Sequence, residues 1–200
     1  MNFEKIEVSQ PKITGFFSPK FNPFNSLRRF HHFNKKGLFR EILLKIDGNA
    51  EKLILPDNQK YFPFLRIYRE SNDYPIKPGA ILAVMFHSDK YTGEKGLRIA
   101  QKRVALFAGL PGFQAKTYYV SPESSWYAGL YCWESVEAAN KYAHSYAYTI
   151  MSKRSSQYKV KYQIVDLAER SIEHPYWKHN YEEILELVGW MKINSSELSE

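Results

Sequence analysis

The most apolar part of the chain consists of two strand-like segments, FQAKTYYV at 113–120 and WYAGLYCW at 126–133, joined by the polar stretch SPESS. Phe, Thr, Tyr, Trp and Val fit the pleated surface of a sheet, and Pro with Ser favours a turn between them. The pattern predicts a β-hairpin. Because an apolar hairpin is not stable alone in water, other elements must cover it.

The segments around this hairpin alternate between strand and helix patterns. Residues 80–87 (AILAVMFH) form a near-continuous apolar run, typical of a strand buried on both faces. Residues 94–110 carry apolar side chains at helical spacing and end at Pro111-Gly112, where Gly112 can take a backbone angle that other residues avoid. Ser135 is a suitable N-cap for a second helix, whose apolar stripe continues to Ile150.

A last alternating strand at 158–167 completes the order strand, helix, strand, strand, helix, strand. That order predicts an α+β fold with a ferredoxin-like βαββαβ core, in which two helices cover one face of a four-stranded antiparallel sheet. We therefore expect a domain at 79–167, an N-terminal extension at 1–78 and a C-terminal helical extension at 168–200. Pro78-Gly79 marks the first boundary.

The extensions carry weaker patterns. Residues 62–68 are expected to form an edge strand, because Pro63 cannot donate a hydrogen bond to a neighbouring strand. Residues 181–191 are expected to form a helix, with Glu182 and Glu183 in a first turn that suits its dipole.

Charge is unevenly distributed over the 200 residues. The formal net charge is +7, and residues 1–40 hold eight Lys and Arg against two Glu, so nearly all of the excess lies there. The core is almost neutral, which argues against DNA binding inferred from the overall charge. Phe residues lie among these basic residues. This pattern favours an arm, formed by residues 1–40, that packs over the core or over a dimer partner with its Phe rings as anchors. The alternative is contact with an anionic membrane surface.

Several classes of protein are disfavoured by composition. Cys132 is the only cysteine, so no internal disulfide forms, which fits a reducing compartment. No apolar run approaches the roughly 20 residues that span a bilayer, and the N-terminal segment has no secretory h-region, so we expect a cytoplasmic protein. His31-His32 lacks metal-ligand spacing, and no metal site is predicted.

Four side chains in the core are candidates for chemistry or binding. His144 lies at the edge of the second helix's apolar stripe and could serve as a general base toward a phenol or enol. Lys116 and Tyr118 share one face of their strand and could hold a carboxylate or enolate. His87, at the end of its strand, is a candidate for the mouth of a pocket. Each also has a structural explanation, as a boundary, snorkelling or strand-end residue.

Tyr131 is a further candidate whose face depends on the register of the turn, because a slip of one residue reverses the face of every side chain.

The core resembles the dimeric α+β barrel superfamily, in particular small monooxygenases related to antibiotic-biosynthesis monooxygenases. The resemblance rests on Leu110-Pro111-Gly112-Phe113, Lys116, Ser121-Pro122-Glu123-Ser124, Gly129-Leu130-Tyr131, and Glu137-Ala138-Ala139 through His144. The chain departs from the family with Ala128 in place of a usual Gly and with the bulky Trp126, which we expect to narrow the pocket. The resemblance implies a homodimer with its sheets face to face and a ligand held between each sheet and its helices.

We therefore expect a small-molecule, monooxygenase-like enzyme that acts on an aromatic or enolisable substrate without a cofactor. The alternative is a non-catalytic ligand-binding or structural protein on the same fold. Haem binding, with His144 as axial ligand, and RNA binding through the aromatic strand at 127–133 are weaker alternatives.

Overall fold

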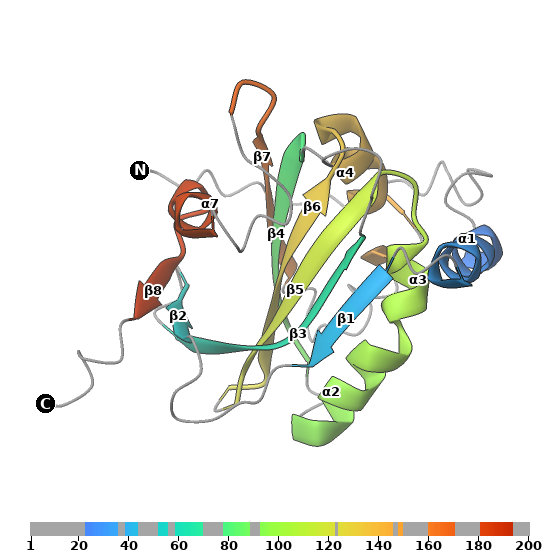
Figure 1. Ribbon diagram of the computed structural model, residues 1–200. Helices are drawn as coiled ribbons and strands as arrows, with labels where there is room; N and C mark the ends of the chain where they lie inside the picture. The colour runs from blue at the N-terminus through green and yellow to red at the C-terminus, as the bar shows by residue number, and fades with distance from the viewer. Residues whose placement is uncertain are drawn as a thin grey trace, which may run out of the picture.

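The computed structural model describes residues 23–35, 39–43, 52–55, 59–69, 78–88, 93–122, 124–145, 148–149, 160–170 and 181–193 (Figure 1). In chain order the elements are α1 (Pro23–Lys35), β1 (Phe39–Leu43), β2 (Lys52–Ile54), β3 (Lys60–Arg69), β4 (Ala80–His87), α2 (Gly93–Lys102), α3 (Val104–Ala108), β5 (Phe113–Ser121), β6 (Trp126–Trp133), α4 (Val136–Ala143), β7 (Val160–Asp166), α7 (Tyr181–Leu187) and β8 (Met191–Ile193).

The predicted ferredoxin-like core is confirmed. Its four strands are neighbours in the order β7-β4-β6-β5, and each adjacent pair is antiparallel. Helices α2 and α3 connect β4 to β5, and α4 follows β6, as the βαββαβ order requires. The hairpin turn sets a register in which Lys116 lies opposite Tyr131 and Tyr118 opposite Gly129.

The connections of the core follow from local chemistry. Gly112 has φ +76°, and a Cβ there would lie 2.7 Å from the Cβ of Ala138, so both the backbone angle and the space require glycine. Ser135 caps α4 by accepting a hydrogen bond from the backbone N–H of Ala138 at 3.1 Å. These two residues bring the start of β5 and the start of α4 together.

Both predicted helices are shorter than expected. The first helix is interrupted at Arg103 and resumes as α3. At the interruption the N–H of Arg103 donates to the carbonyl oxygen of Ala100, three residues earlier instead of four. The second ends at Ala143 instead of continuing to Ile150. The C-terminal helix ends at Leu187, and Gly189, with φ 68°, separates it from β8.

The expectation that residues 62–68 form an edge strand is wrong. Strand β3 pairs with β5 on one side, while its two ends pair with β2 and β1 on the other. Pro63 is tolerated because it lies between the segments that pair with β2 and β1, at a register irregularity between Pro63 and Leu65. The N-terminal extension thus adds strands to the same sheet.

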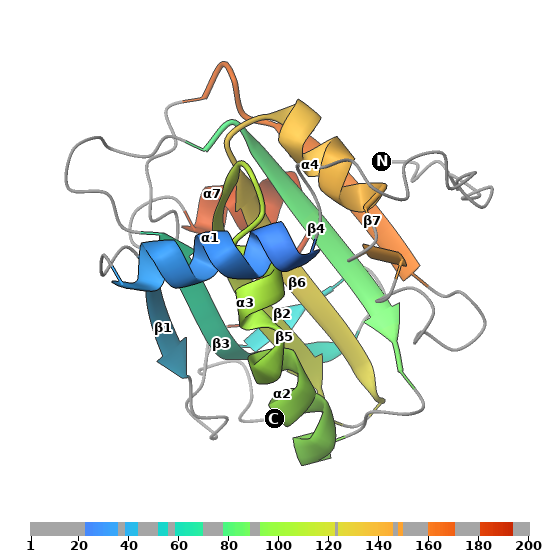
Figure 2. The ribbon, with the colours of Figure 1, turned by 90° about the vertical axis from the view of Figure 1, so that its right-hand side faces the viewer.

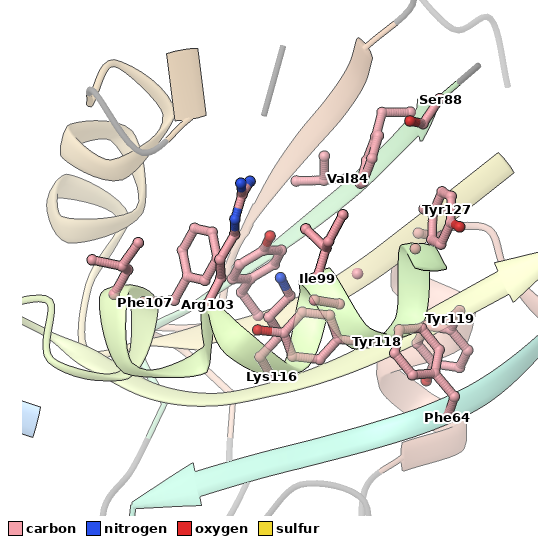
Figure 3. Close-up of a pocket in the computed structure, with 17 residues that line it drawn as sticks. Phe64, Val84, Ser88, Ile99, Arg103, Phe107, Lys116, Tyr118, Tyr119 and Tyr127 are labelled. Carbon is pink, nitrogen blue, oxygen red and sulfur yellow. The ribbon is translucent and has the colours of Figure 1, made fainter. Parts of the chain in front are cut away.

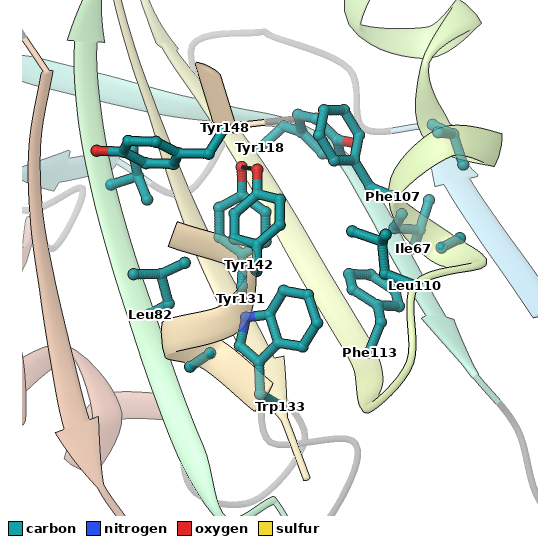
Figure 4. Packing of buried hydrophobic residues seen from close by; sticks show 14 of the residues in the cluster. Ile67, Leu82, Phe107, Leu110, Phe113, Tyr118, Tyr131, Trp133, Tyr142 and Tyr148 are labelled. Atoms are coloured by element: carbon teal, nitrogen blue, oxygen red, sulfur yellow. Dashed lines mark hydrogen bonds between the residues drawn. The ribbon is translucent and has the colours of Figure 1, made fainter. Parts of the chain in front are cut away.

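The face of the sheet that carries Lys116 packs against α2, α3 and α4 (Figure 2). Its cluster centres on Trp133, Tyr131 and Tyr142, which are nearly inaccessible to solvent (Figure 4). The Tyr142 hydroxyl donates to the Tyr131 hydroxyl at 3.2 Å, which satisfies a buried polar group on each ring.

The opposite face of the same strands is also buried. Side chains of β4, β5 and β6 on this face form a second cluster with residues of β2, α7 and the segment that leads into β8, among them Leu53, Ile184 and Trp190. Trp190 packs edge-on against Tyr119, with ring centroids 5.7 Å apart. In Figure 1, α7, β2 and β8 lie on one side of the sheet and α1 to α4 on the other. The C-terminal segment is therefore part of the core.

This arrangement corrects the expected packing of subunits. The family resemblance assigns the second face to a partner subunit, whereas here the chain's own α7, β2 and β8 region buries it. Ala115, Leu130 and Cys132 on this face are completely inaccessible to solvent. A homodimer remains a prediction, but it cannot form through this face without removing α7.

Helix α1 lies across α3, as the arm interpretation expects (Figure 2). The Ser26 hydroxyl donates to the carbonyl of Leu106 at 2.5 Å, and Phe30 packs against the helix-side cluster. Pro23 occupies the first position of α1, where its missing N–H costs nothing. Phe24 is not an anchor, because 78% of it is exposed. The expectations for residues 1–22 lie outside the described residues.

The role of α7 in the core can be tested by truncating Ile184, which is fully buried. We expect Ile184→Ala to lower the free energy of unfolding by about 2–5 kcal/mol, because it leaves a cavity in the second cluster. Urea denaturation measures this change. The matched control is Glu186→Ala on the exposed side of α7, with an expected change within about 0.5 kcal/mol. Equal stability of the two variants would contradict a core role for α7.

Candidate functional site

A pocket lies between the sheet and the α2–α3 helices, at the place that the family resemblance predicts for a ligand (Figure 3). Its volume is about 190 Å³. Strands β3 to β6 form its floor, and α2 and α3 form its roof. Its lining is mainly aromatic and aliphatic: Phe64, Val84, Phe86, Ser88, Gly96, Ile99, Ala100, Arg103, Leu106, Phe107, Lys116, Tyr118, Tyr119, Tyr127, Ala128, Gly129 and Tyr131.

Lys116 is the most unusual side chain in this pocket, because it is 96% buried among aromatic rings. Its Nζ lies 3.5 Å from the ring centroid of Tyr118, 4.2 Å from that of Tyr131 and 4.7 Å from that of Phe107. Two of these rings come from β5 and β6, and the third comes from α3. The amine is therefore held in place by three elements of the fold.

Among the residues that the structure describes, none beside Lys116 supplies a negative charge. No Asp or Glu within the described ranges lines the pocket, and no ion pair between described residues includes Lys116. Burial lowers the pKa of Lys116 well below its usual value of 10.5, because the ammonium loses its hydration. The three rings return part of that loss through cation–π attraction, which favours the charged form. The second basic residue in the lining, Arg103, keeps its charge at any working pH.

The space around the amine depends on Gly129. A Cβ at this position would lie 3.2 Å from Cε of Lys116 and 2.9 Å from the Tyr131 ring. Only glycine leaves room for both side chains at their present positions. Tyr131 is itself neutral, since burial raises its pKa well above its usual value.

Ser88 supplies a polar group elsewhere in the lining. It is 2% exposed, and its Oγ has no hydrogen-bond partner within the described residues. A buried hydroxyl without a partner costs free energy. Together with Lys116 and Arg103, Ser88 gives an otherwise apolar pocket a few polar contacts for a ligand.

Of the residues singled out in the sequence, the structure brings together Lys116, Tyr118 and Tyr131. Lys116 and Tyr118 share a face of β5, as the period of two predicts. The question left open for Tyr131 has a clear answer, since it lies directly opposite Lys116 and lines the same pocket.

His144 differs from its expected position at the edge of a cleft. It is exposed at the C-terminal end of α4, and its Nδ1 lies 2.8 Å from the carbonyl oxygen of Asn140. It does not line the pocket. The expected position assumed that the helix continues past Ala143. The helix ends at Ala143, and His144 is its C-cap residue. His144 therefore has no geometric route to a ligand beside Lys116.

His87, Trp126 and Ala128 also differ from expectation. The side chain of His87 lies on the far face, where its ring meets Trp126 edge-on at 5.5 Å, while its neighbour Ser88 lines the pocket. Trp126 and Ala128 pack with the second cluster. Neither side chain narrows the pocket, because each alternates away from Tyr127 and Gly129.

Arg103, Phe107 and Ser88 are pocket residues that we did not predict as such. Phe107 belongs to the apolar side chains at helical spacing in residues 94–110, which form the pocket roof. Arg103 lies at the break between α2 and α3 and lines the pocket, and no pattern in the sequence singled it out. Ser88 has no signal of its own in the sequence beyond its position after a buried strand.

The weaker alternatives do not fit this site. None of the described residues that line the pocket is a His, Cys or Met that could ligate haem iron, and burial raises the pKa of Tyr127 and Tyr131, which opposes phenolate ligation. Tyr127, Tyr131 and Trp133 are buried beneath helices, so they cannot stack on RNA bases. Within the described residues there is no group of three or more potential metal ligands and no helix that could span a membrane.

Comparisons with known proteins give structural similarity only. No family model and no curated protein matches the chain. The solved structures that match include a ferredoxin-fold protein related to antibiotic biosynthesis monooxygenases from Listeria monocytogenes (11% identity, 64% of this chain, 90% of that chain, TM-score 0.38). A monooxygenase-like protein from Listeria innocua also matches (11% identity, 60% of this chain, 81% of that chain, TM-score 0.41). A third match is a heme-degrading enzyme from Listeria monocytogenes (14% identity, 64% of this chain, 97% of that chain, TM-score 0.35).

The strand order and register described above define the class of protein on their own: an α+β protein with a ferredoxin-like core, extended by strands and helices from both ends of the chain.

The burial of Lys116 predicts a dependence of stability on pH. The unfolded chain holds this proton up to about the usual pKa of 10.5, whereas the folded protein releases it at lower pH. Between these two pKa values the unfolded state binds more protons, so this residue makes the free energy of unfolding rise with pH. We expect Lys116→Met to be more stable at neutral pH, by about 0.5–2 kcal/mol. The advantage should shrink as the pH approaches 10.5.

Urea denaturation of wild type and Lys116→Met across this pH range measures the effect. Lys102→Met, which changes an exposed lysine on α2, is the control and should show no such convergence. Parallel pH curves for wild type and Lys116→Met would show that the Lys116 pKa is not lowered by folding.

Proposed function

We propose that the protein binds a small aromatic or enolisable compound in the pocket between the sheet and the α2–α3 helices, and that it acts on this compound as a monooxygenase-like enzyme. One observation carries the proposal: the Lys116 amine lies inside an apolar, aromatic-lined pocket, and no described residue of its lining is acidic. Keeping an amine in such a place is costly, and perturbed groups of this kind concentrate at functional sites.

The size and polarity of the pocket limit the ligand. A volume of about 190 Å³ is somewhat larger than the roughly 150 Å³ of an apolar cavity that holds benzene. The ligand therefore contains about one ring or a short branched chain. The described part of the lining holds two basic groups and no acidic one, which favours a ligand that carries or develops a single negative charge, such as a carboxylate, phenolate or enolate.

Lys116, in place of His144, is the group positioned to act as a base. With a lowered pKa, the neutral amine can take a proton from a phenol or enol, and the ammonium that results pairs with the anion it has created. An electron-rich anion of this kind can react with O2. In the overall step a CH2 group and O2 give a carbonyl group and water, so the substrate supplies all the electrons.

The second candidate is a non-catalytic ligand-binding protein. It is favoured by the exposure of His144 and by a lining whose described residues include no histidine or carboxylate. Both candidates predict binding at Lys116 and differ in whether bound ligand is consumed together with oxygen.

Benzoate, which has one ring and one negative charge, tests the binding site. We expect isothermal titration calorimetry to show binding with uptake of a proton at neutral to mildly alkaline pH, because the benzoate anion pairs with the protonated amine. Affinity should fall as the pH rises, since the anion then meets a neutral amine. Titrations in buffers of different ionisation enthalpy measure the proton uptake.

Variants distinguish the hypothesis that Lys116 contacts the ligand from the hypothesis that His144 does. Lys116→Met should weaken benzoate binding by about tenfold or more, and a tenfold loss of affinity corresponds to about 1.4 kcal/mol. The same variant should also remove the proton uptake. His144→Ala should leave both unchanged. Benzyl alcohol, the neutral isostere, should bind without proton uptake. Undiminished benzoate binding by Lys116→Met would refute the proposed site.

Oxygen uptake distinguishes the two candidate functions. An enolisable probe, 1,3-indanedione, is incubated with wild type and with Lys116→Met in an oxygen electrode. Consumption of O2 above the spontaneous rate by wild type alone supports the enzyme. Binding of the probe without consumption favours the non-catalytic protein.

A further inference from the structure

We propose that the Lys116 amine forms a reversible imine with an aldehyde or ketone that has a small apolar body, which makes Lys116 a covalent carbonyl-binding residue. The inference rests on the proposed function in one respect, namely that small molecules enter this pocket. It extends the ligand class from acids that pair with the amine to carbonyl compounds that react with it.

The first support is the placement of the nitrogen. The Lys116 Nζ lies 3.5–4.7 Å from three ring centroids, on β5, β6 and α3, so its position is set by the fold. The rings also give an apolar body of a ligand its natural contacts. A carbonyl carbon bonded to a ring or short chain would therefore lie close to the amine whenever the body occupies the pocket.

The second support is the electrostatic surroundings of the amine. The rings of Tyr131 from β6 and Tyr118 from β5 face it, and Arg103 from the α2–α3 connection lines the same pocket. A carboxylate would hold the ammonium charged and unreactive, but no carboxylate among the described residues lines the pocket. Lysines desolvated in this way act as nucleophiles toward carbonyl groups.

The third support is the strand beneath the amine. The side of β6 beneath Lys116 carries Gly129, where even one added carbon would lie 3.2 Å from the lysine Cε. Glycine at this position therefore lets the lysine side chain lie across β6 with its Nζ among the three rings. The same position gives a test that does not remove the amine.

The reaction balances without an oxidant or a metal. The nitrogen lone pair forms a bond to the carbonyl carbon, and the carbonyl oxygen takes up a proton as the nitrogen loses one. Loss of water from this carbinolamine then leaves the C=N bond. The products are one imine and one water molecule, and added water reverses the reaction.

Borohydride trapping with benzaldehyde tests the inference, because benzaldehyde has the same ring as benzoate but an electrophilic carbon. The protein is incubated with benzaldehyde near neutral pH, reduced with sodium cyanoborohydride and digested, and benzylated lysines are located by mass spectrometry. We expect Lys116 to be modified at least about tenfold faster than exposed lysines, since each unit of pKa lowering increases the neutral amine about tenfold. Lys102 and Lys161 provide this comparison within the same sample.

Three controls connect trapping to the pocket. Benzoate should protect Lys116 and leave Lys102 and Lys161 unchanged. Lys116→Arg, which keeps a cation and cannot form an imine, should lose only the preferential modification, with folding checked by circular dichroism. Gly129→Ala should slow trapping at Lys116, because the added methyl group would lie 3.2 Å from the lysine Cε and displace the side chain from its position among the rings.

The outcomes separate this inference from the proposed function. Benzoate binding with proton uptake, but modification of Lys116 no faster than that of Lys102, would overturn the imine and leave the binding site intact. Absence of both benzoate binding and trapping would overturn both. Preferential trapping that benzoate does not suppress would also overturn the inference, since the reaction would then occur outside the ligand site.

Discussion

The structure depends on one constraint: the central strands β4, β5 and β6 are apolar on both faces, so both faces must be removed from water. The helices between the strands cover one face, as in any ferredoxin-like core. The other face is covered by segments more than 100 residues apart in the chain, β2 near one end and α7 near the other. The protein thus supplies from its own extensions a cover for which a minimal core would require another chain.

The two covers differ in consequence. On the far face, Trp190, Tyr119 and Leu130 pack into an apolar cluster. On the helix face, a pocket lies between the sheet and the α2–α3 helices, and Lys116 lies within it across Gly129. A lysine in such surroundings reduces stability, because its ammonium loses hydration that the aromatic rings only partly replace. Binding of a ligand to the amine would explain why a lysine occupies this position despite the loss of stability.

Replacing His144 by Lys116 as the central residue changes the expected chemistry. A histidine on the edge of a helix would have acted as an ordinary base near neutral pH, as its pattern position suggested. In the proposed roles the buried amine acts as a base and as a nucleophile, and it is the loss of hydration that lowers its pKa. The rings that stabilise the protonated amine would also contact an apolar ligand, so we expect ligand binding and proton affinity to be coupled through one set of contacts.

Much of this protein was determined by local sequence pattern. The period of two placed Lys116 and Tyr118 on one face, the strand and helix order specified the ferredoxin-like core, and Gly112 and Ser135 marked its connections. These features follow from the immediate neighbours of each residue, so the sequence alone reveals them. The position of Tyr131 required the register of the hairpin, and that of His144 required the point where α4 ends. The pocket at Lys116 and the cover from α7 depend on contacts between distant segments, and only the tertiary structure decided them.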